Sequence, residues 1–486
     1  MSTRPAGQRL LCLPSSEADV KQYTPKRNIE YMRKNLFPLM LLCLALSSCG
    51  IYNKYQRPEE IRTDGLFGQG VEVQEDSTSI ASLSWRELFT DPSLQALIDT
   101  ALANNTDLLS ARQRVKEAEA TLMSARLAYL PSFMLTPQGG VSSFDGGAAT
   151  WTYTAVAAAS WELDIFGRLT NAKRSAKALY QQSREYEQAV VTALIANVSN
   201  LYYTLLMLDE QAGITRETAQ TWRESVRTMQ AMKAAGMTNE AGVSQFEANC
   251  RMVEASLLDL EQQIRTVENA LCVILGRMPG KIDRESAWSL RDFPEELTVG
   301  IPLQLLSRRP DVRAAELSLV QAFYGTNAAR ASFYPSVTLG GTAGWTNSVG
   351  SMIVNPGKVL LAAVGSLTQP LFANGRNVAQ LKIAKARQEE AKLAFQQSLL
   401  NAGSEVNNAL TQVQTARSKA QLRIEQIAAL ERTLTSTRLL MRHGNTTYLE
   451  VLTAQQALLS ARLAQTADRF SEVQGIIQLY QALGGR

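Results

Sequence analysis

One short phrase occurs twice in the chain and decides its organisation. Ala125-Arg126-Leu127-Ala128-Tyr129-Leu130-Pro131-Ser132 recurs as Ala329-Arg330-Ala331-Ser332-Phe333-Tyr334-Pro335-Ser336, at an offset of 204 residues. Each copy follows a segment with helical period and precedes an alternating segment rich in glycine. Because the residue before a proline avoids the helical backbone conformation, Pro131 and Pro335 are predicted helix-to-strand junctions. The chain is therefore predicted to contain two copies of one unit.

The repeat continues beyond this phrase. Further identical residues recur at slightly larger offsets: Ser160 and Phe166 as Ser366 and Phe372 at 206, and Gly167 and Arg168 as Gly375 and Arg376 at 208. We predict a unit of one helix, a β-hairpin and two long helices. It occupies residues 84–290 and again residues 291–486, after an extended leader at residues 49–83.

The segments after the two prolines are predicted hairpins. In the first copy, residues 133–144 and 151–163 flank an Asp-Gly-Gly turn, and the second copy offers residues 336–345 and 359–371. Their weak alternation of apolar and polar residues fits membrane-barrel strands, and it also fits an ordinary solvated hairpin. The pattern alone leaves both interpretations open.

Long helices are predicted at residues 170–208 and 215–275, which contain no proline. From Val253 to Ile274, apolar residues alternate steps of four and three, which is a coiled-coil period. The longer helix would measure about 90 Å. Cys250 and Cys272 would lie about 33 Å apart on it, so they cannot form a disulfide with each other.

The N-terminal segment resembles a bacterial lipoprotein signal. Residues 33–34 are basic, an apolar run covers residues 36–46, and Cys49 follows small residues. We predict that residues 1–48 comprise an upstream extension and a signal peptide, and that Cys49 carries acyl chains such as palmitate. The alternative is an incidental cysteine after an ordinary signal peptide.

Net charge gives no support for a nucleic-acid partner. The whole chain has 49 Lys and Arg against 45 Asp and Glu, but residues 1–48 contain seven basic and three acidic residues. The mature chain therefore has 42 of each sign (49 minus 7 and 45 minus 3). A neutral chain lacks the basic surface that nucleic-acid binding requires.

Two hairpins give only four strands, which cannot close a membrane barrel. Open sheet edges are not tolerated in lipid, so several copies must combine if the strands cross a membrane. Three copies would supply twelve strands, enough to leave a lumen, and twelve helical rods below it.

Several segments together resemble the outer membrane factor family of TolC-like channels, in particular its lipoprotein branch. They are the Cys49 segment, Tyr55-Gln56-Arg57-Pro58, residues 85–97, the doubled phrase, and residues 444–455. The resemblance implies a mostly α-helical homotrimer in which a twelve-stranded outer membrane β-barrel continues as a coiled-coil barrel through the periplasm. It implies a passive efflux duct, lipid-anchored in the outer membrane, that works with a periplasmic adaptor and an inner-membrane RND-type transporter.

Two other functions remain open at this point. A TolC-like duct can serve type I protein secretion, and a lipid-anchored periplasmic coiled-coil scaffold would carry the same helices with its hairpins in water.

The resemblance also implies a periplasmic gate just after the turn between the two long helices of the second copy, at residues 441–454. Many relatives have acidic residues at the positions of Glu450 and Thr453, and here only Glu450 is acidic. A ring of three Glu450 side chains would attract cations and could pair with Arg442 or His443. The alternative is that Glu450 is an ordinary solvated helix residue.

Catalytic chemistry finds no support in the sequence. His443 is the only histidine, and no HExxH, GxxxxGK[ST] or GxSxG motif is present. We therefore predict a protein that is not an enzyme, with no cofactor and no metal site. Trp151, Trp161 and Trp345 fall in the predicted hairpins, where they would form interfacial belts or pack in a core.

Overall fold

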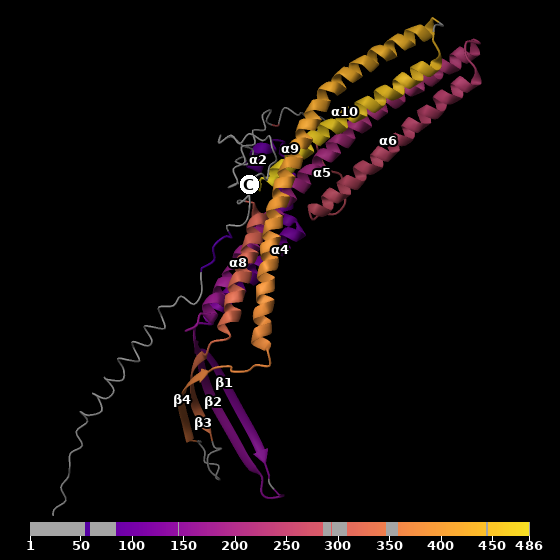
Figure 1. Cartoon of the computed structure of the whole chain (residues 1–486). Coiled ribbons are helices and arrows are strands. Elements are labelled where there is room, and N and C mark those ends of the chain that lie inside the picture. The colour runs from indigo at the N-terminus through magenta and orange to yellow at the C-terminus, as the bar shows by residue number, and fades with distance from the viewer. Residues whose placement is uncertain are drawn as a thin grey trace, which may run out of the picture. The chain divides into compact units, whose positions relative to one another are not determined.

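The helices and strands of the computed structural model follow the predicted order (Figure 1). The structure describes residues 54–58, 84–143, 145–284, 293, 309–346, 358–443 and 446–485, so Cys49 lies outside the described residues. In chain order the elements are α2 (Trp85–Leu88), α3 (Pro92–Asn104), α4 (Thr106–Leu127), β1 (Ser132–Ser142), β2 (Thr150–Leu163), α5 (Arg168–Ala234), α6 (Glu240–Ile274), α8 (Pro310–Ala331), β3 (Ser336–Thr346), β4 (Lys358–Thr368), α9 (Arg376–Arg442) and α10 (Tyr448–Ala482).

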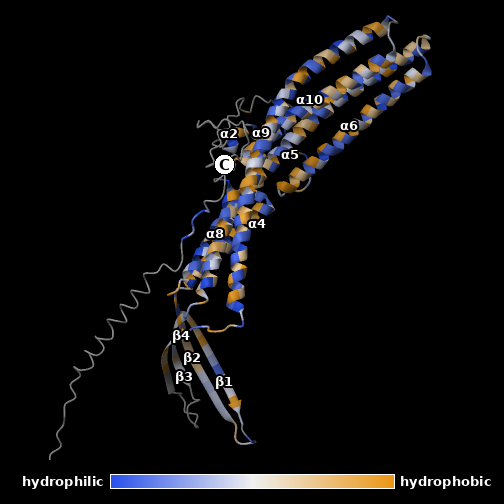
Figure 2. Cartoon of the chain, viewed as in Figure 1, coloured by the Kyte–Doolittle hydropathy of each residue, from blue (hydrophilic) through white to orange (hydrophobic). Residues whose placement is uncertain are grey.

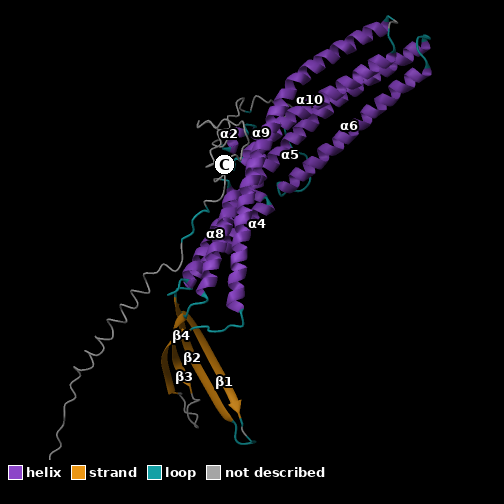
Figure 3. Ribbon diagram, in the orientation of Figure 1, coloured by secondary structure: helices purple, strands orange, loops and turns teal. Residues whose placement is uncertain are grey.

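The two halves have matching elements. Helices α4 and α8 each contain 22 residues, α5 and α9 each contain 67, and α6 and α10 each contain 35. Within residues 55–486, the four strands lie at one end of the helices, and the α5–α6 and α9–α10 turns lie at the other (Figure 3). Each half therefore runs from a short helix through a hairpin into two long helices.

The predicted break between the first two long helices was wrong. Helix α5 continues through residues 209–214, and the chain turns instead at residues 235–239. Gly213 lies inside α5, and a β-carbon added to it would have no other atom within 4 Å. No neighbouring segment therefore forces a bend at this glycine. Gly236 has a φ of 74°, which suits glycine and ends the helix, and Asn239 then caps α6 through a bond from the Gly242 amide.

Capping explains where the first helices begin. Asp91 caps α3, because its Oδ1 accepts the Ser93 amide at 2.7 Å. Helix α4 has a cap of the same kind. Asn105 is the cap, and its Oδ1 accepts the amides of residues 107 and 108 at 3.0 Å each.

Buried aromatic and aliphatic side chains form the main core where α3, α5, α6 and α10 meet. Phe89 and Tyr480 pack edge to face, and the hydroxyl of Tyr202 donates to the capping carboxylate of Asp91. Cys272 is buried in this core, Cys250 is buried in a second cluster, and both are free thiols, as their predicted spacing requires.

A buried ion cluster fastens the segment after α6 to the long helices. The Arg284 guanidinium donates to both carboxylate oxygens of Asp209 on α5, at 2.5 and 3.0 Å, and to Glu268 on α6 at 2.7 Å. Burial alone would lower the pKa of Arg284, but the hydrogen bonds to the two carboxylates outweigh it and raise that pKa. The segment is thus held by a permanent charge.

The described part of the leader docks on the second half. Arg57 forms a bidentate ion pair with Glu316 of α8, and Tyr55 packs edge to face on Phe323 of the same helix. Burial is the main cause that raises the pKa of Tyr55 to about 12. The leader is therefore seated on α8 only a few residues after Cys49.

Among the described residues, one helix is long and apolar enough to cross a membrane. It is α5, whose best 18-residue window has a mean hydropathy of 1.4 and is 56% buried. Helix α5 also supplies many side chains of the main core, including Leu194, Val198 and Leu205. Core packing accounts for this hydropathy.

The strands form one antiparallel sheet in the order β1-β2-β3-β4. Ser132 lies opposite Ser160, Leu163 opposite Val337, and Ser336 opposite Thr368. Strand β4 ends at Thr368 rather than at the predicted residue 371, because its neighbour β3 begins at Ser336. The turn of the first hairpin contains Asp145 and Gly146, both at positive φ, as the Asp-Gly-Gly sequence predicts.

Candidate functional site: a two-faced open sheet, its junctions and the far helix turn

The register divides the sheet into an apolar face and a polar face. Side chains alternate along each strand, and directly opposite residues share a face. The apolar face consists of Phe133, Leu135, Pro137, Gly139 and Val141; Trp151, Tyr153, Ala155, Ala157, Ala159, Trp161 and Leu163; Val337, Leu339, Gly341, Ala343 and Trp345; and Leu361, Ala363, Gly365 and Leu367.

Every Ser, Thr, Gln and Glu among the described side chains of these strands lies on the polar face. The apolar face carries no charge, and Figure 2 shows the strands as mostly pale or hydrophobic beside helices with many hydrophilic residues. A sheet in water would not leave such a face exposed, whereas a barrel in lipid requires it.

Aromatic residues mark the two ends of the apolar face. Trp161 lies near the helices, while Trp151 and Trp345 lie near the hairpin turns. Trp151 and Trp161 are ten residues apart on β2, which is about 33 Å along a strand. Because barrel strands are tilted, their separation across the membrane is about 20–25 Å, close to the height of the apolar band of an outer membrane barrel. This geometry favours the belt interpretation of the three tryptophans.

The sheet has two open edges. Among the described strands, β1 pairs only with β2, and β4 pairs only with β3. Among the described residues, each edge leaves a row of backbone N–H and C=O groups without a neighbouring strand in one copy of the chain. Lipid supplies no hydrogen bonds, so a membrane sheet of this kind must close against other copies.

Both predicted junction prolines stand between a helix and a strand. Pro131 separates the end of α4 from Ser132, and Pro335 separates the end of α8 from Ser336. At the first junction, the indole N–H of Trp161 donates to the carbonyl of Tyr129 at 2.8 Å. This bond joins the end of α4 to the strand that leads into α5.

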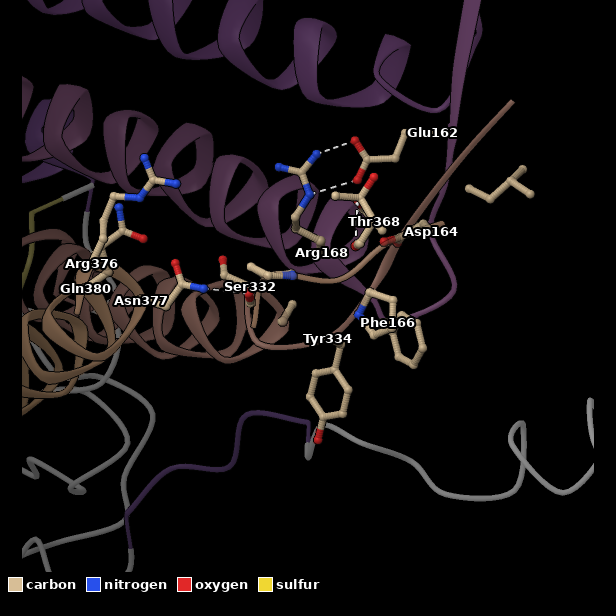
Figure 4. A pocket seen from close by; sticks show the side chains of 15 residues that line it. Glu162, Asp164, Phe166, Arg168, Ser332, Tyr334, Thr368, Arg376, Asn377 and Gln380 are labelled. Carbon is tan, nitrogen blue, oxygen red and sulfur yellow. Dashed lines mark hydrogen bonds and ion pairs between the residues drawn. The ribbon is translucent and has the colours of Figure 1, made fainter. Parts of the chain in front are cut away.

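A pocket of about 370 Å³ lies at the junctions, with Pro335 in its lining (Figure 4). Arg168 forms a bidentate ion pair with Glu162, with one contact of 2.8 Å. Asp164 accepts the Leu169 amide at 2.8 Å and thereby stabilises the start of α5. The rings of Phe166 and Tyr334 stack with centroids 5.2 Å apart, which joins the two junctions.

Sequence reasoning missed these polar contacts. A signal was present, since Glu162 and Arg168 flank the strand-to-helix boundary and Asp164 precedes the glycine that starts α5. The register places three of the residues that line this pocket, Glu162, Ser336 and Thr368, on the polar face.

The predicted gate residues lie at the α9–α10 turn. His443 is exposed at the end of α9, and the side chain of Arg442 lies outside the described ones. Glu450 and Thr453 are both exposed on one stripe of α10, three residues apart. Glu450 and His443 form no ion pair among the described side chains of one copy, and their pairing in a ring of three copies stays a prediction.

The opposite side of α10 packs against the α5–α6 pair. Leu452 is buried in the second cluster with Trp222 and Phe246, and Tyr448 packs on Phe246 with ring centroids 6.4 Å apart. Glu450 is therefore directed away from the α5–α6 pair. Metal-binding geometry does not arise here, because no group of three His, Cys, Asp or Glu that could hold an ion occurs among the described residues.

A family model of outer membrane efflux proteins matches residues 97–277 and 301–485. The cation efflux system protein CusC of Escherichia coli strain K12 is 29% identical over 457 residues, which cover 91% of this chain and 98% of CusC. The toluene efflux pump outer membrane protein TtgC of Pseudomonas putida is 28% identical over 472 residues, which cover 93% of this chain and 96% of TtgC.

Solved structures show the same fold. A crystal structure of CusC superposes with a TM-score of 0.82 at 28% identity and covers 90% of this chain and all of that chain. The open state of the MtrE outer membrane channel of Neisseria gonorrhoeae gives a TM-score of 0.80 at 28% identity, covering 90% of this chain and 98% of MtrE.

Proposed function

Since the chain belongs to the outer membrane efflux protein family, we propose that three copies form the exit duct of a tripartite efflux pump. The protein is an outer membrane efflux channel that extends through the periplasm, and it is not an enzyme. One observation carries the proposal. Four strands present a continuous apolar face about 20–25 Å high and have open edges on both sides.

Three identical sheets would close this barrel with twelve strands, and their polar faces would line a wet lumen. Each copy contributes two repeats, which we assign to residues 84–290 and 291–486. The duct has no energy source of its own, so it depends on an inner-membrane RND-type transporter and a periplasmic adaptor. The efflux relatives favour this role over type I protein secretion, and the apolar face disfavours a scaffold with hairpins in water.

The substrate is a small molecule selected by the inner-membrane transporter. CusC is named for cations and TtgC for toluene, although both cover nearly all of this chain at similar identity. Relatives of one architecture thus serve chemically different cargo, which fits a duct that does not select strongly.

Conductance of planar bilayers tests the channel function. We expect detergent-extracted, full-length protein to form heat-sensitive trimers and to raise bilayer conductance in discrete steps. A Cys49→Ala chain without the signal segment that is soluble and monomeric in buffer would support the scaffold instead.

Cys49 is proposed as the lipid anchor. The leader is seated on α8 at Tyr55 and Arg57, which leaves six residues, or at most about 20 Å of extended chain, to reach the membrane. Mass spectrometry of the mature N-terminal peptide is expected to find acyl chains on Cys49. An unmodified chain that begins upstream of Cys49 would contradict this.

Glu450 is proposed to form the periplasmic gate ring. Three carboxylates around a narrow lumen attract cations, and only one acid per copy lies on this stripe of α10 because Thr453 replaces the second. We expect Glu450→Gln to lower cation selectivity or raise leak conductance in planar bilayers, and Thr453→Asp to raise cation selectivity. If neither variant changes selectivity or leak, Glu450 is an ordinary solvated residue.

A further inference from the structure

We infer the register in which one copy joins the next, an inference that rests on the proposed barrel. Strand β4 lies antiparallel to β1 of the next copy, with Thr368 opposite Thr136, Gly365 opposite Gly139 and Ala362 opposite Ser142 of that copy. In each of these pairs the two residue numbers add up to 504.

The internal repeat supplies the rule. The first repeat maps onto the second by adding 204 to residues of α4 and β1, and 208 to residues from β2 onward. The offset of 206 expected from the sequence was therefore wrong for Ser160, which is equivalent to Thr368 rather than to Ser366. The strand pairing obeys this, since Ser132 opposite Ser160 becomes Ser336 opposite Thr368. The four extra residues lie between the end of β3 and the start of β4 in the sequence.

A side-chain hydrogen bond confirms the two offsets independently. Trp161 donates to the Tyr129 carbonyl at 2.8 Å, and Gln369 donates to the Phe333 carbonyl at 3.0 Å. Gln369 is Trp161 plus 208, and Phe333 is Tyr129 plus 204. Different side chains thus make the same contact at equivalent positions, so the mapping holds at the junction as well as in the strands.

The same mapping predicts the strand pairing between two copies of the chain from the pairing between the two repeats within one chain. Within one copy, β2 pairs with β3, and Ala157 lies opposite Ala343. Adding 208 to Ala157 gives Gly365 of β4, and subtracting 204 from Ala343 gives Gly139 of β1. If the barrel repeats its internal contact at every boundary, Gly365 faces Gly139 of the next copy.

This register meets two requirements, and the second of them excludes every register that is shifted by an odd number of residues. Strands in the order β1 to β4 alternate in direction, so β4 beside the next β1 is antiparallel like every other pair. Gly365 and Gly139 both belong to the apolar face, so the lipid surface stays continuous across the boundary. A register slipped by one residue would turn that face into the lumen.

Uniform stagger selects among the registers that remain. Ala159 of β2 lies directly opposite Phe133 of β1, and Gly341 of β3 lies directly opposite Ala159. By the repeat mapping, Gly341 is equivalent to residue 137 of the first repeat, which is four residues beyond Phe133. The second repeat is therefore displaced by four residues along the strands relative to the first repeat. The inferred register repeats this displacement between copies, as regular closure of a barrel requires.

Disulfide trapping tests the register in the full-length protein in outer membranes. The pair Thr368→Cys with Thr136→Cys lies on the polar face, where an oxidant reaches it through the lumen. Directly opposite residues are about 4.5–5.5 Å apart between α-carbons, within the range of a disulfide, and residues shifted by two are about 7–8 Å apart. We expect covalent dimers and trimers on non-reducing gels, formed at least ten times faster than in the shifted controls.

The controls keep the same face and change only the register. They combine Thr368→Cys with Met134→Cys or with Gln138→Cys, and each single-cysteine variant is included. The buried thiols Cys250 and Cys272 are common to all. A second pair in the inferred register, Ser366→Cys with Gln138→Cys, replaces the first if that variant fails to assemble.

Faster trapping of a shifted pair in assembled trimers would overturn the register and leave the proposed channel intact. Failure of the proposed function is a different result, because the parent chain without the added cysteines would then form neither trimers nor conducting channels.

Discussion

Ala157→Arg is expected to remove the protein from the outer membrane as a trimer. Ala157 lies at the middle of β2 on the apolar face, between Leu135 and Ala343. An arginine facing lipid at the bilayer midplane costs about 2–4 kcal/mol, and three copies raise the cost to roughly 6–12 kcal/mol per barrel. Heat-sensitive trimers in outer membrane fractions should fall more than tenfold.

Ala158→Arg is the matched control because the next residue along β2 lies on the polar face, opposite Met134 and Thr342. An arginine there enters a wet lumen, so trimers should persist while ion selectivity shifts toward anions. Equal assembly of the two variants, whether both succeed or both fail, would show that the faces do not differ as the register implies.

Arg284→Met is expected to give the largest loss of stability outside the barrel. The Arg284 side chain is 9% exposed and Glu268 is 12% exposed, so removing the guanidinium leaves a buried carboxylate without its partner. The cost is on the order of 3 kcal/mol per copy, because Asp209 keeps some contact with water. The midpoint of thermal unfolding, followed by helical circular dichroism, should fall by several degrees.

Two further variants test whether the unpaired buried charge causes the loss of stability. Arg216 forms a solvent-exposed ion pair with Glu261 between α5 and α6, so Arg216→Met should change the midpoint very little. Adding Asp209→Asn and Glu268→Gln to Arg284→Met should recover part of the loss, since no buried charge then remains. No recovery in the triple variant would mean that Arg284 acts mainly through packing.

The order of elements could be predicted because local signals agree with it. Pro131 and Pro335 mark the ends of two helices, the Asp-Gly-Gly turn marks the first hairpin, and Asp91 marks the start of α3. These features depend on backbone conformation within a few residues. Family resemblance then supplied the barrel, which no single strand could reveal.

The turn after α5 was missed because hydrophobic period does not mark where a long helix ends. The sequence repeat could have located this turn, since Ala235-Gly236 is equivalent to His443-Gly444 at the offset of 208. A glycine with positive φ ended the helix there, while Gly213 was tolerated inside it.

The lipid-facing surface could not be derived from the sequence for another reason. Alternation within β1 or β4 is weak, and the apolar face becomes continuous only when the register aligns four strands. The junction pair of Glu162 and Arg168 likewise depends on how β2 turns into α5. Non-local pairing decides both, so only the structure reveals them.

Imaging of the full-length protein extracted in detergent tests the central claim most directly. Three copies, each with four strands and two pairs of long helices, should give particles with three-fold symmetry, in which a twelve-stranded barrel continues into a helical tube about 100 Å long or more. Monomeric particles, or a symmetry other than three-fold, would contradict the account.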